Sequence, residues 1–431
     1  MSLGWPGWAA SAAKIGTIGL GLEAASIGPP GLSLATWKVA GIGLLVLVWL
    51  SYQVTPVMYN VVERVQVLLV GVAIVVAVVI FLFLGSAAEL AKAPSGVFAV
   101  GTIPAGSDIA LLLGGIAFAG AGGYLNLSQS LWVREKGYGM GRYQGRVKNP
   151  VVGDEPEPVH RDGFTFPPSV TNLQRWRGWW RLVQLEHLLT FVLGLVVTGT
   201  MLMAVAAENA TTTTDDAVVM WTEGIVPQVG AIPGAFVFVA LFAALLTTEY
   251  GIVESVVRNS ADVIYELHGR DAGWSLPRIF WLVLTAFVAW GILILALPLP
   301  ISLERPFGLL VAGAVLSGLM MWPYTALLTV VNATRLPEPT QPGWGRLVAL
   351  WWATAFLGYF SALIVGNWLS SLPGTALFAT ELTVLGSAPG GYALFLLVAL
   401  IQVYVMGVSA RGKLEASGTV PEASEARSLF H

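Results

Sequence analysis

The sequence contains no cysteine and only four histidines among its 431 residues. The absence of cysteine excludes disulfides, iron–sulfur clusters and thiolate metal sites. Only His187 lies near an apolar run, so we expect no haem held by paired histidines inside a bilayer. Charge is scarce too: Asp, Glu, Lys and Arg make up 11% of the chain, against about 25% in a typical soluble domain. So few charges could not cover a globular surface, which rules out a soluble enzyme.

Apolar and small residues dominate instead. The chain is 56% hydrophobic, with a mean hydropathy of +0.74, 49 glycines and 17 tryptophans. In membrane proteins small residues let helices approach closely, and tryptophan gathers at the interfaces. The net charge is −3, and the basic residues form no patch suited to nucleic acid. We therefore predict an all-α polytopic membrane protein whose environment is the lipid bilayer, with no nucleic-acid partner.

Nine apolar runs predict membrane-spanning helices. A helix needs about 20 residues to cross roughly 30 Å of hydrocarbon, and these runs lack the alternation of barrel strands. The predicted spans are Lys38–Val54, Val65–Leu84, Ile109–Val133, Leu185–Ala207, Gly234–Val257, Ile279–Leu299, Phe307–Val331, Leu347–Asn367 and Tyr392–Val408.

Charge differs between alternate loops. The loop Arg134–Arg181 is strongly basic, as are Arg258–Arg278 and the tail after Arg411, whereas the loop around Glu208 and Glu223 is acidic. Basic loops stay in the cytoplasm, so the C-terminus is predicted inside. We divide the chain into an outer helix end and extracellular loop (1–37), a transmembrane domain (38–408) and a cytoplasmic polar tail (409–431). We further expect the chain to be N-terminally incomplete.

The third predicted span is rich in glycine. Gly120, Gly122 and Gly123 fall within four positions, and Tyr124, Asn126 and Gln129 follow. Each glycine costs a helix interior about 1 kcal/mol relative to alanine, so the pattern favours a helix broken near 119–126. Unwound backbone at this depth is found where it is buried or lines a wet cavity, and transporters use it to bind ions. A helix-packing face of small residues is the alternative.

Acidic and sulfur-containing side chains add further candidates. Glu249 lies well inside the fifth span, after Thr248, where an acid is expensive unless partnered or hydrated. It is a candidate coupling site, with a structural hydrogen bond to a neighbouring helix as the alternative, whereas Glu254 is expected to be solvated. In the seventh span Met321 and Tyr324 flank Pro323; methionine can bind soft metals, but packing is the simpler interpretation.

The order of these features resembles the Nramp family of proton-coupled divalent metal transporters. The segment Tyr59-Asn60-Val61-Val62-Glu63-Arg64 is similar to the lead-in to the family's fifth helix. The segment from Gly120 to Lys136 looks like its sixth helix, and Gly234–Val257, with Thr247-Thr248, like its eighth. Phe307–Val331 with Pro323 looks like the tenth, and the last two spans like the eleventh and twelfth.

The resemblance implies an inverted-repeat fold whose first and sixth helices are broken around the substrate. It also implies a multi-pass protein of a prokaryotic plasma membrane.

The sequence departs from the family's pattern at two places. The family's first helix, with its Asp-Pro-Gly-Asn motif, has no counterpart, and Gly122-Gly123-Tyr124 replaces its Met-Pro-His motif. A site of backbone oxygens, Asn126 and Gln129 would suit a harder cation, such as Mg²⁺ or hydrated Mn²⁺.

We therefore expect a secondary transporter of divalent metal cations (Mn/Fe/Mg class), proton-coupled through Glu249, with the cation as cargo, no tightly bound cofactor and no enzymatic activity. The candidate cation-binding residues are Gly120, Gly122, Gly123, Tyr124, Asn126 and Gln129, with Thr248, Met321 and Tyr324 as secondary candidates. Two alternatives stay open. One is a transporter of the same fold for an organic, amino-acid-like substrate, and the other a scaffold that docks a partner through Arg134–Arg181.

Overall fold

The computed structural model describes residues 4–23, 25–29, 33–97, 108–119, 122–153, 155–161, 164, 166–211, 214, 216–298 and 305–416. Over these residues the protein is almost entirely helical, and its one sheet is the two-stranded hairpin of β1 (Ser26–Ile27) and β2 (Leu34–Ala35). The chain forms two compact units. Unit 1 comprises Met1–Pro104, Leu125–Phe164 and Glu186–Gly313, and unit 2 comprises Ala105–Tyr124, Thr165–Leu185 and Ala314–His431.

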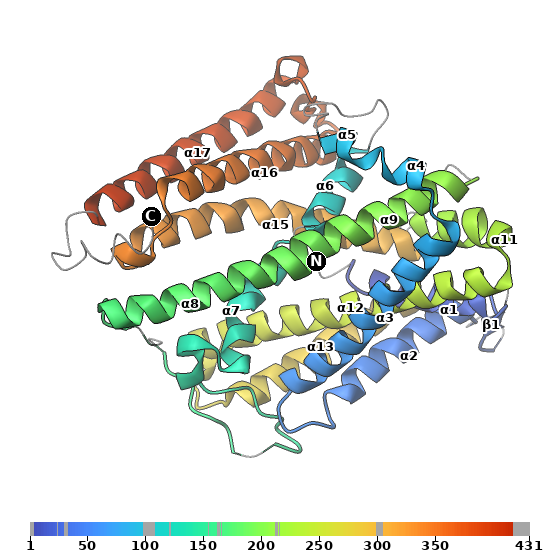
Figure 1. Cartoon of the computed structure of the whole chain (residues 1–431), viewed down its shortest axis with the longest axis horizontal. Coiled ribbons are helices and arrows are strands. Elements are labelled where there is room, and N and C mark those ends of the chain that lie inside the picture. The colour runs from blue at the N-terminus through green and yellow to red at the C-terminus, as the bar shows by residue number, and fades with distance from the viewer. Residues whose placement is uncertain are drawn as a thin grey trace. The chain divides into compact units, whose positions relative to one another are not determined.

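Figure 1 shows the helices in chain order, and the long ones follow the apolar runs of the sequence. Three π-helical segments, η2 (His187–Leu193), η3 (Met220–Ile225) and η4 (Tyr265–Gly269), adjoin α-helices. The α-helices are α1 (Gly7–Gly19), α2 (Thr36–Ser51), α3 (Tyr59–Leu84), α4 (Ala87–Leu90), α5 (Ala93–Val97), α6 (Ile109–Ala119), α7 (Tyr124–Lys136), α8 (Val170–Glu186), α9 (Gly194–Asn209), α10 (Ala217–Val219), α11 (Val226–Val229), α12 (Ala231–Ile264), α13 (Leu276–Ala296), α15 (Pro306–Thr334), α16 (Trp344–Ser370) and α17 (Pro389–Ala416).

Seven helices in the described part of the chain are long and apolar enough to cross a membrane, in agreement with the predicted all-α polytopic membrane protein. They correspond to seven of the nine predicted spans. The other two differ. Lys38–Val54 forms α2, whose 16 residues would reach about 24 Å at 1.5 Å per residue. Ile109–Val133 is divided between α6 and α7.

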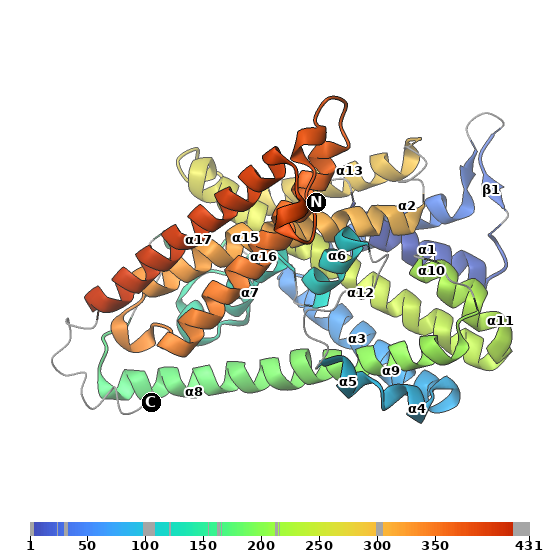
Figure 2. The same cartoon turned by 90° about the horizontal axis from the view of Figure 1, so that it is seen from above.

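Unit 1 is built around α12, which packs against α3, α1 and α13, while α2 packs on α1 and α13. Figure 1 shows these helices side by side, and Figure 2 shows the β1 hairpin beyond the ends of α1 and α2. The helix end predicted within residues 1–37 corresponds to α1, which continues to Gly19 and lies in the core of the unit. Trp5 is 2% exposed, and its ring stacks on Phe287 with centroids 4.1 Å apart. Small residues make this burial possible, because α1 presents mainly alanine and glycine to its neighbours.

Unit 2 contains the pair α16 and α17, together with α6, α8 and most of α15. The Trp351 indole N–H donates to Ser409 Oγ at 2.8 Å, which fixes α16 against α17. A Cβ atom built on Gly114 would lie 3.1 Å from Ala314 Cβ, and one on Gly318 would lie 3.0 Å from Leu113 Cγ. Glycines on both helices therefore bring α6 and α15 into close contact.

Candidate functional site

Glu249 occupies the interior of α12 and is completely buried. Its Oε2 accepts a hydrogen bond of 3.1 Å from the backbone N–H of Ala9. Ala9 lies in the first turn of α1, where backbone N–H groups have no partner within the helix and the helix dipole is positive. The carboxylate thus caps α1. This contact is the structural hydrogen bond to a neighbouring helix that the sequence analysis gave as the alternative to a coupling role.

The other oxygen of Glu249 has no hydrogen-bond partner in the described part of the chain. The same is true of two other buried atoms on α1 and α12, Ser11 Oγ and Thr247 Oγ1. A buried polar group without a partner is costly, and a buried ionised carboxylate without compensation far more so. Glu249 is therefore suited to hold a proton, or to contribute one oxygen to a small cation. Its coupling role stays a prediction.

The glycine-rich stretch interrupts the third predicted span. Helix α6 ends at Ala119 and α7 begins at Tyr124, and between them Gly123 has a φ of +47°. The Gly122 N–H donates to the Ala117 carbonyl at 2.7 Å, a bond that closes the end of α6. A Cβ atom on Gly123 would stand 2.4 Å from the Ser317 carbonyl oxygen of α15. Both interpretations of the sequence therefore apply here, since the helix is broken and the glycines also pack closely.

The remaining predicted residues are divided between the units. Gly120 and the side chain of Tyr124 lie outside the described residues. In unit 1, Asn126 and Gln129 are half-buried on α7, and the Thr248 hydroxyl donates to the Ala244 carbonyl of its own helix. In unit 2, Met321 and Tyr324 are half-buried on α15, about one and two turns beyond Ser317 respectively. Within the described ranges no three His, Cys, Asp or Glu side chains are grouped to hold a metal.

A buried ionic network in unit 1 was not predicted. Arg258 is 1% exposed and forms ion pairs with Glu254 of its own helix and with Glu135 of α7, the latter at 2.6 Å. The Tyr52 hydroxyl donates to Glu254 Oε2 at 3.0 Å. The expectation that Glu254 is solvated is wrong, since its side chain is fully buried. The reason is that protein, rather than water, covers this part of α12.

The network is held in place by its surroundings. The Val147 N–H donates to both oxygens of Glu135, at 3.2 and 3.1 Å, and Asn149 Nδ2 donates to the Tyr52 carbonyl at 2.8 Å. A hydroxyl and amide cluster adjoins it, in which Ser128 of α7 bonds Ser255 of α12 and accepts from Asn259 Nδ2 at 2.7 Å. The network therefore ties α7, α12, the end of α2 and the segment 147–149 together.

Part of this network was detectable in the sequence. Glu254 and Arg258 are four residues apart in a helix, a spacing that places opposite charges on one face. The partner Glu135 is 123 positions away from Arg258, and no local pattern reveals such a contact.

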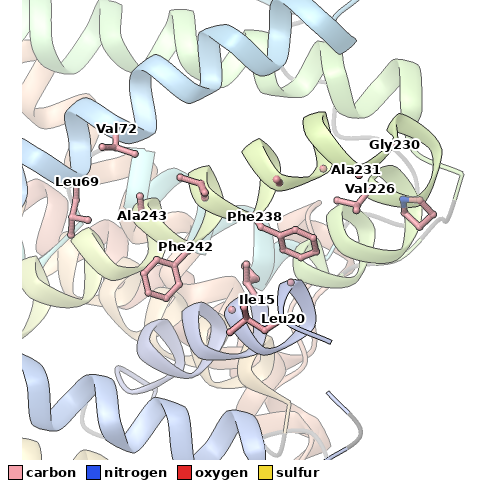
Figure 3. Close-up of a pocket in the computed structure, with 16 residues that line it drawn as sticks. Ile15, Leu20, Leu69, Val72, Val226, Gly230, Ala231, Phe238, Phe242 and Ala243 are labelled. Atoms are coloured by element: carbon pink, nitrogen blue, oxygen red, sulfur yellow. The ribbon is translucent and has the colours of Figure 1, made fainter. Parts of the chain in front are cut away.

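An apolar cavity of about 730 Å³ lies between α1, α3, α11 and α12, all in unit 1. Figure 3 shows Phe238 and Phe242 projecting from α12 toward Ile15 of α1 and Leu20, which directly follows that helix. The side chains around it are aliphatic or aromatic, so the cavity offers no side-chain ligand to an ion. It accommodates apolar groups, and we do not include it in the candidate cation site.

Comparison of the chain with protein-family models, with curated proteins and with solved structures finds no match in any of the three.

Proposed function

We propose that the protein is a secondary transporter that moves a divalent cation across the membrane in exchange for, or together with, protons. The observation that carries the proposal is the carboxyl group of Glu249, which is fully buried within a membrane-spanning helix. One of its oxygens has no partner among the residues that the structure describes. Acids at such depth are rare and typically mark ion or proton pathways.

The hydrogen bond from the Ala9 N–H to Glu249 then has a mechanical role. While Glu249 is ionised, its bond to the first turn of α1 is charge-assisted, and such bonds are about twice as strong as neutral ones. Protonation or cation binding neutralises the carboxylate and weakens this bond. The charge state of Glu249 then controls how firmly α1 is held against α12.

The break between α6 and α7 is the second support. An interrupted helix frees backbone carbonyls that can replace the water shell of a cation. The amide oxygens of Asn126 and Gln129 on α7 are hard donors, and such donors favour a cation such as Mg²⁺ or Mn²⁺.

Uptake of Mn²⁺ and Mg²⁺ into proteoliposomes, with and without an inward proton gradient, tests the proposal. We expect the gradient to stimulate uptake of at least one ion, and Glu249→Gln to abolish that stimulation. Glu223→Gln is the matched control, because Glu223 is an exposed acid. Gradient-dependent uptake that survives Glu249→Gln would refute the role of Glu249. No uptake of either ion by folded protein would refute the cation proposal and favour the organic-substrate alternative.

A further inference from the structure

Helix α8 carries a concentration of arginine and tryptophan without acids. Arg175, Arg177 and Arg181 alternate with Trp176, Trp179 and Trp180, and the first acid along the helix is its last residue, Glu186. Arg175 and Arg181 are exposed and Arg177 is half-exposed. Together with η2 and α9, this helix forms a helical segment of 40 residues, Val170–Asn209. About 20 residues suffice to cross the hydrocarbon, and the apolar residues of the segment lie mainly in η2 and α9, so α8 extends beyond the apolar core of the bilayer.

The arginines of α8 differ from the cations of unit 1 in their partners. In unit 1, Arg134, Lys136, Lys148 and Arg258 each pair with a carboxylate. Within the described part of the chain, no carboxylate pairs with Arg175, Arg177 or Arg181. Arg177 and Arg181 lie one helical turn apart, a spacing at which like charges repel. A bound anion between them would remove that repulsion.

Contacts with α16 place this part of α8 near a membrane interface. The Arg346 guanidinium lies over the Trp180 ring, 4.7 Å from its centroid. Arg346 stands in the first turn of α16, two residues after the exposed Trp344, so Trp180 is level with the end of a membrane-spanning helix. Tryptophan is enriched at this level of the bilayer, where the phosphate groups of the lipids lie.

The other cations in the described part of unit 2 gather at the helix ends on this side. Arg335 follows α15, Arg346 lies in the first turn of α16, and Arg411 and Lys413 lie in the last turns of α17. The bond between Trp351 and Ser409 and the contact of Gly412 with Thr334 hold these ends together. In the described part of unit 2, the acids at these ends are Glu338 and Glu415, the latter paired with Arg411. The balance is strongly positive.

We propose that the face of α8 bearing Arg177 and Arg181, together with Arg346 of α16, binds the phosphate groups of anionic phospholipids. Guanidinium groups bind phosphate oxygens in a bidentate manner, and clusters of basic residues beside a membrane-spanning helix attract anionic lipid. The stacked rings of Trp176 and Trp180, 5.3 Å apart, anchor the same turn of the helix among the headgroups.

The lack of cysteine provides a direct test with the full chain. Gly178 lies between the two arginines, and a Cβ atom there would meet nothing within 4 Å, so Gly178→Cys accepts a nitroxide label without disturbing its neighbours. The labelled protein is reconstituted in vesicles of phosphatidylcholine alone, or in vesicles in which one third of the lipid is phosphatidylglycerol. The readout is the collision rate of the label with a water-soluble nickel complex.

We expect phosphatidylglycerol to reduce this collision rate by about twofold or more, and high salt to reverse the reduction by screening the charges. Arg177→Gln with Arg181→Gln should abolish the reduction, whereas replacement of both by lysine should keep most of it. Soluble glycerol phosphate added to phosphatidylcholine vesicles should not reproduce it.

The control removes the same charge elsewhere in the basic loops, through Arg142→Gln with Arg161→Gln, both exposed residues. An equal collision rate in the two kinds of vesicle would overturn the proposal. So would an equal loss of the effect in the control, because the attraction would then be a property of net charge rather than of α8. The salt dependence requires no substitution, so the proposal remains testable even if a variant fails to fold.

Discussion

Arg258 is the residue on which the buried network of unit 1 depends. It is the common partner of Glu254 and Glu135, all three being almost completely buried. Arg258→Gln would leave Glu254 without its counter-ion and Glu135 with only the more distant Arg134, at 3.9 Å. Breaking a buried pair in this way costs about 3–5 kcal/mol. We expect a clear fall in the thermal unfolding temperature in detergent. The double change Glu254→Gln with Arg258→Gln should be less destabilising than Arg258→Gln alone. A single variant as stable as the unaltered protein would mean that the pair contributes little.

Glu157 provides a pH dependence outside the membrane. Burial alone would raise the pKa of Glu157, but the Arg146 N–H at 2.8 Å and the Lys148 ammonium at 2.9 Å outweigh it and hold that pKa below its ordinary value. A lowered folded-state pKa means that the stabilisation is present above the unfolded-state pKa and is lost as the pH falls through the folded-state value.

We therefore expect the segment around Glu157 to open as the pH falls through the lowered pKa of Glu157, below the ordinary range of a glutamate. Hydrogen exchange of its peptide, compared between the unaltered protein and Glu157→Gln, measures this, since the variant should exchange faster near neutral pH and lose the difference in acid. Glu155→Gln is the control, because Glu155 is exposed. A difference that persists in acid would exclude the charge of Glu157 as its cause.

At the scale of elements, the interruption between α6 and α7 depends on Gly123. Alanine there would adopt a left-handed conformation, at a cost of about 1–3 kcal/mol, and its Cβ would collide with the Ser317 carbonyl. We expect Gly123→Ala to destabilise the protein and to impair any activity that depends on the break. Gly115→Ala on α6 is the matched control, because a Cβ atom there meets nothing within 4 Å. Equal melting temperatures for the two variants would contradict this view of Gly123.

At the scale of the whole molecule, the predicted sidedness is open to direct measurement. The loop charges predict that Arg142 faces the cytoplasm and that Leu385, which is 89% exposed, faces outward. Since the chain has no other cysteine, Leu385→Cys should react with an impermeant maleimide in intact cells, and Arg142→Cys only after permeabilisation. The reverse pattern would invert the topology.

Much of the helical architecture was predictable, and most of the site's environment was not. Long apolar runs predicted the seven spanning helices because burial in lipid requires them, and the glycines near 120 predicted a break because they destabilise a helix. Glu249 stood out as an acid within an apolar run. Its contact with Ala9 lies 240 positions away in the chain, and only tertiary packing creates it. The same holds for the burial of α1 and of Glu254.

Helix α12 carries both Glu249 and Glu254, five residues and about 7.5 Å apart along the axis. An uninterrupted helix transmits displacement along its length, so α12 cannot tilt away from α1 at Glu249 without straining the contacts of Glu254 and Arg258. The ion pairs of Arg258 should therefore raise the activation barrier of any motion that separates α12 from α7. The activation enthalpy of such a motion would include their rupture, and turnover would rise steeply with temperature even though the network lies away from Glu249.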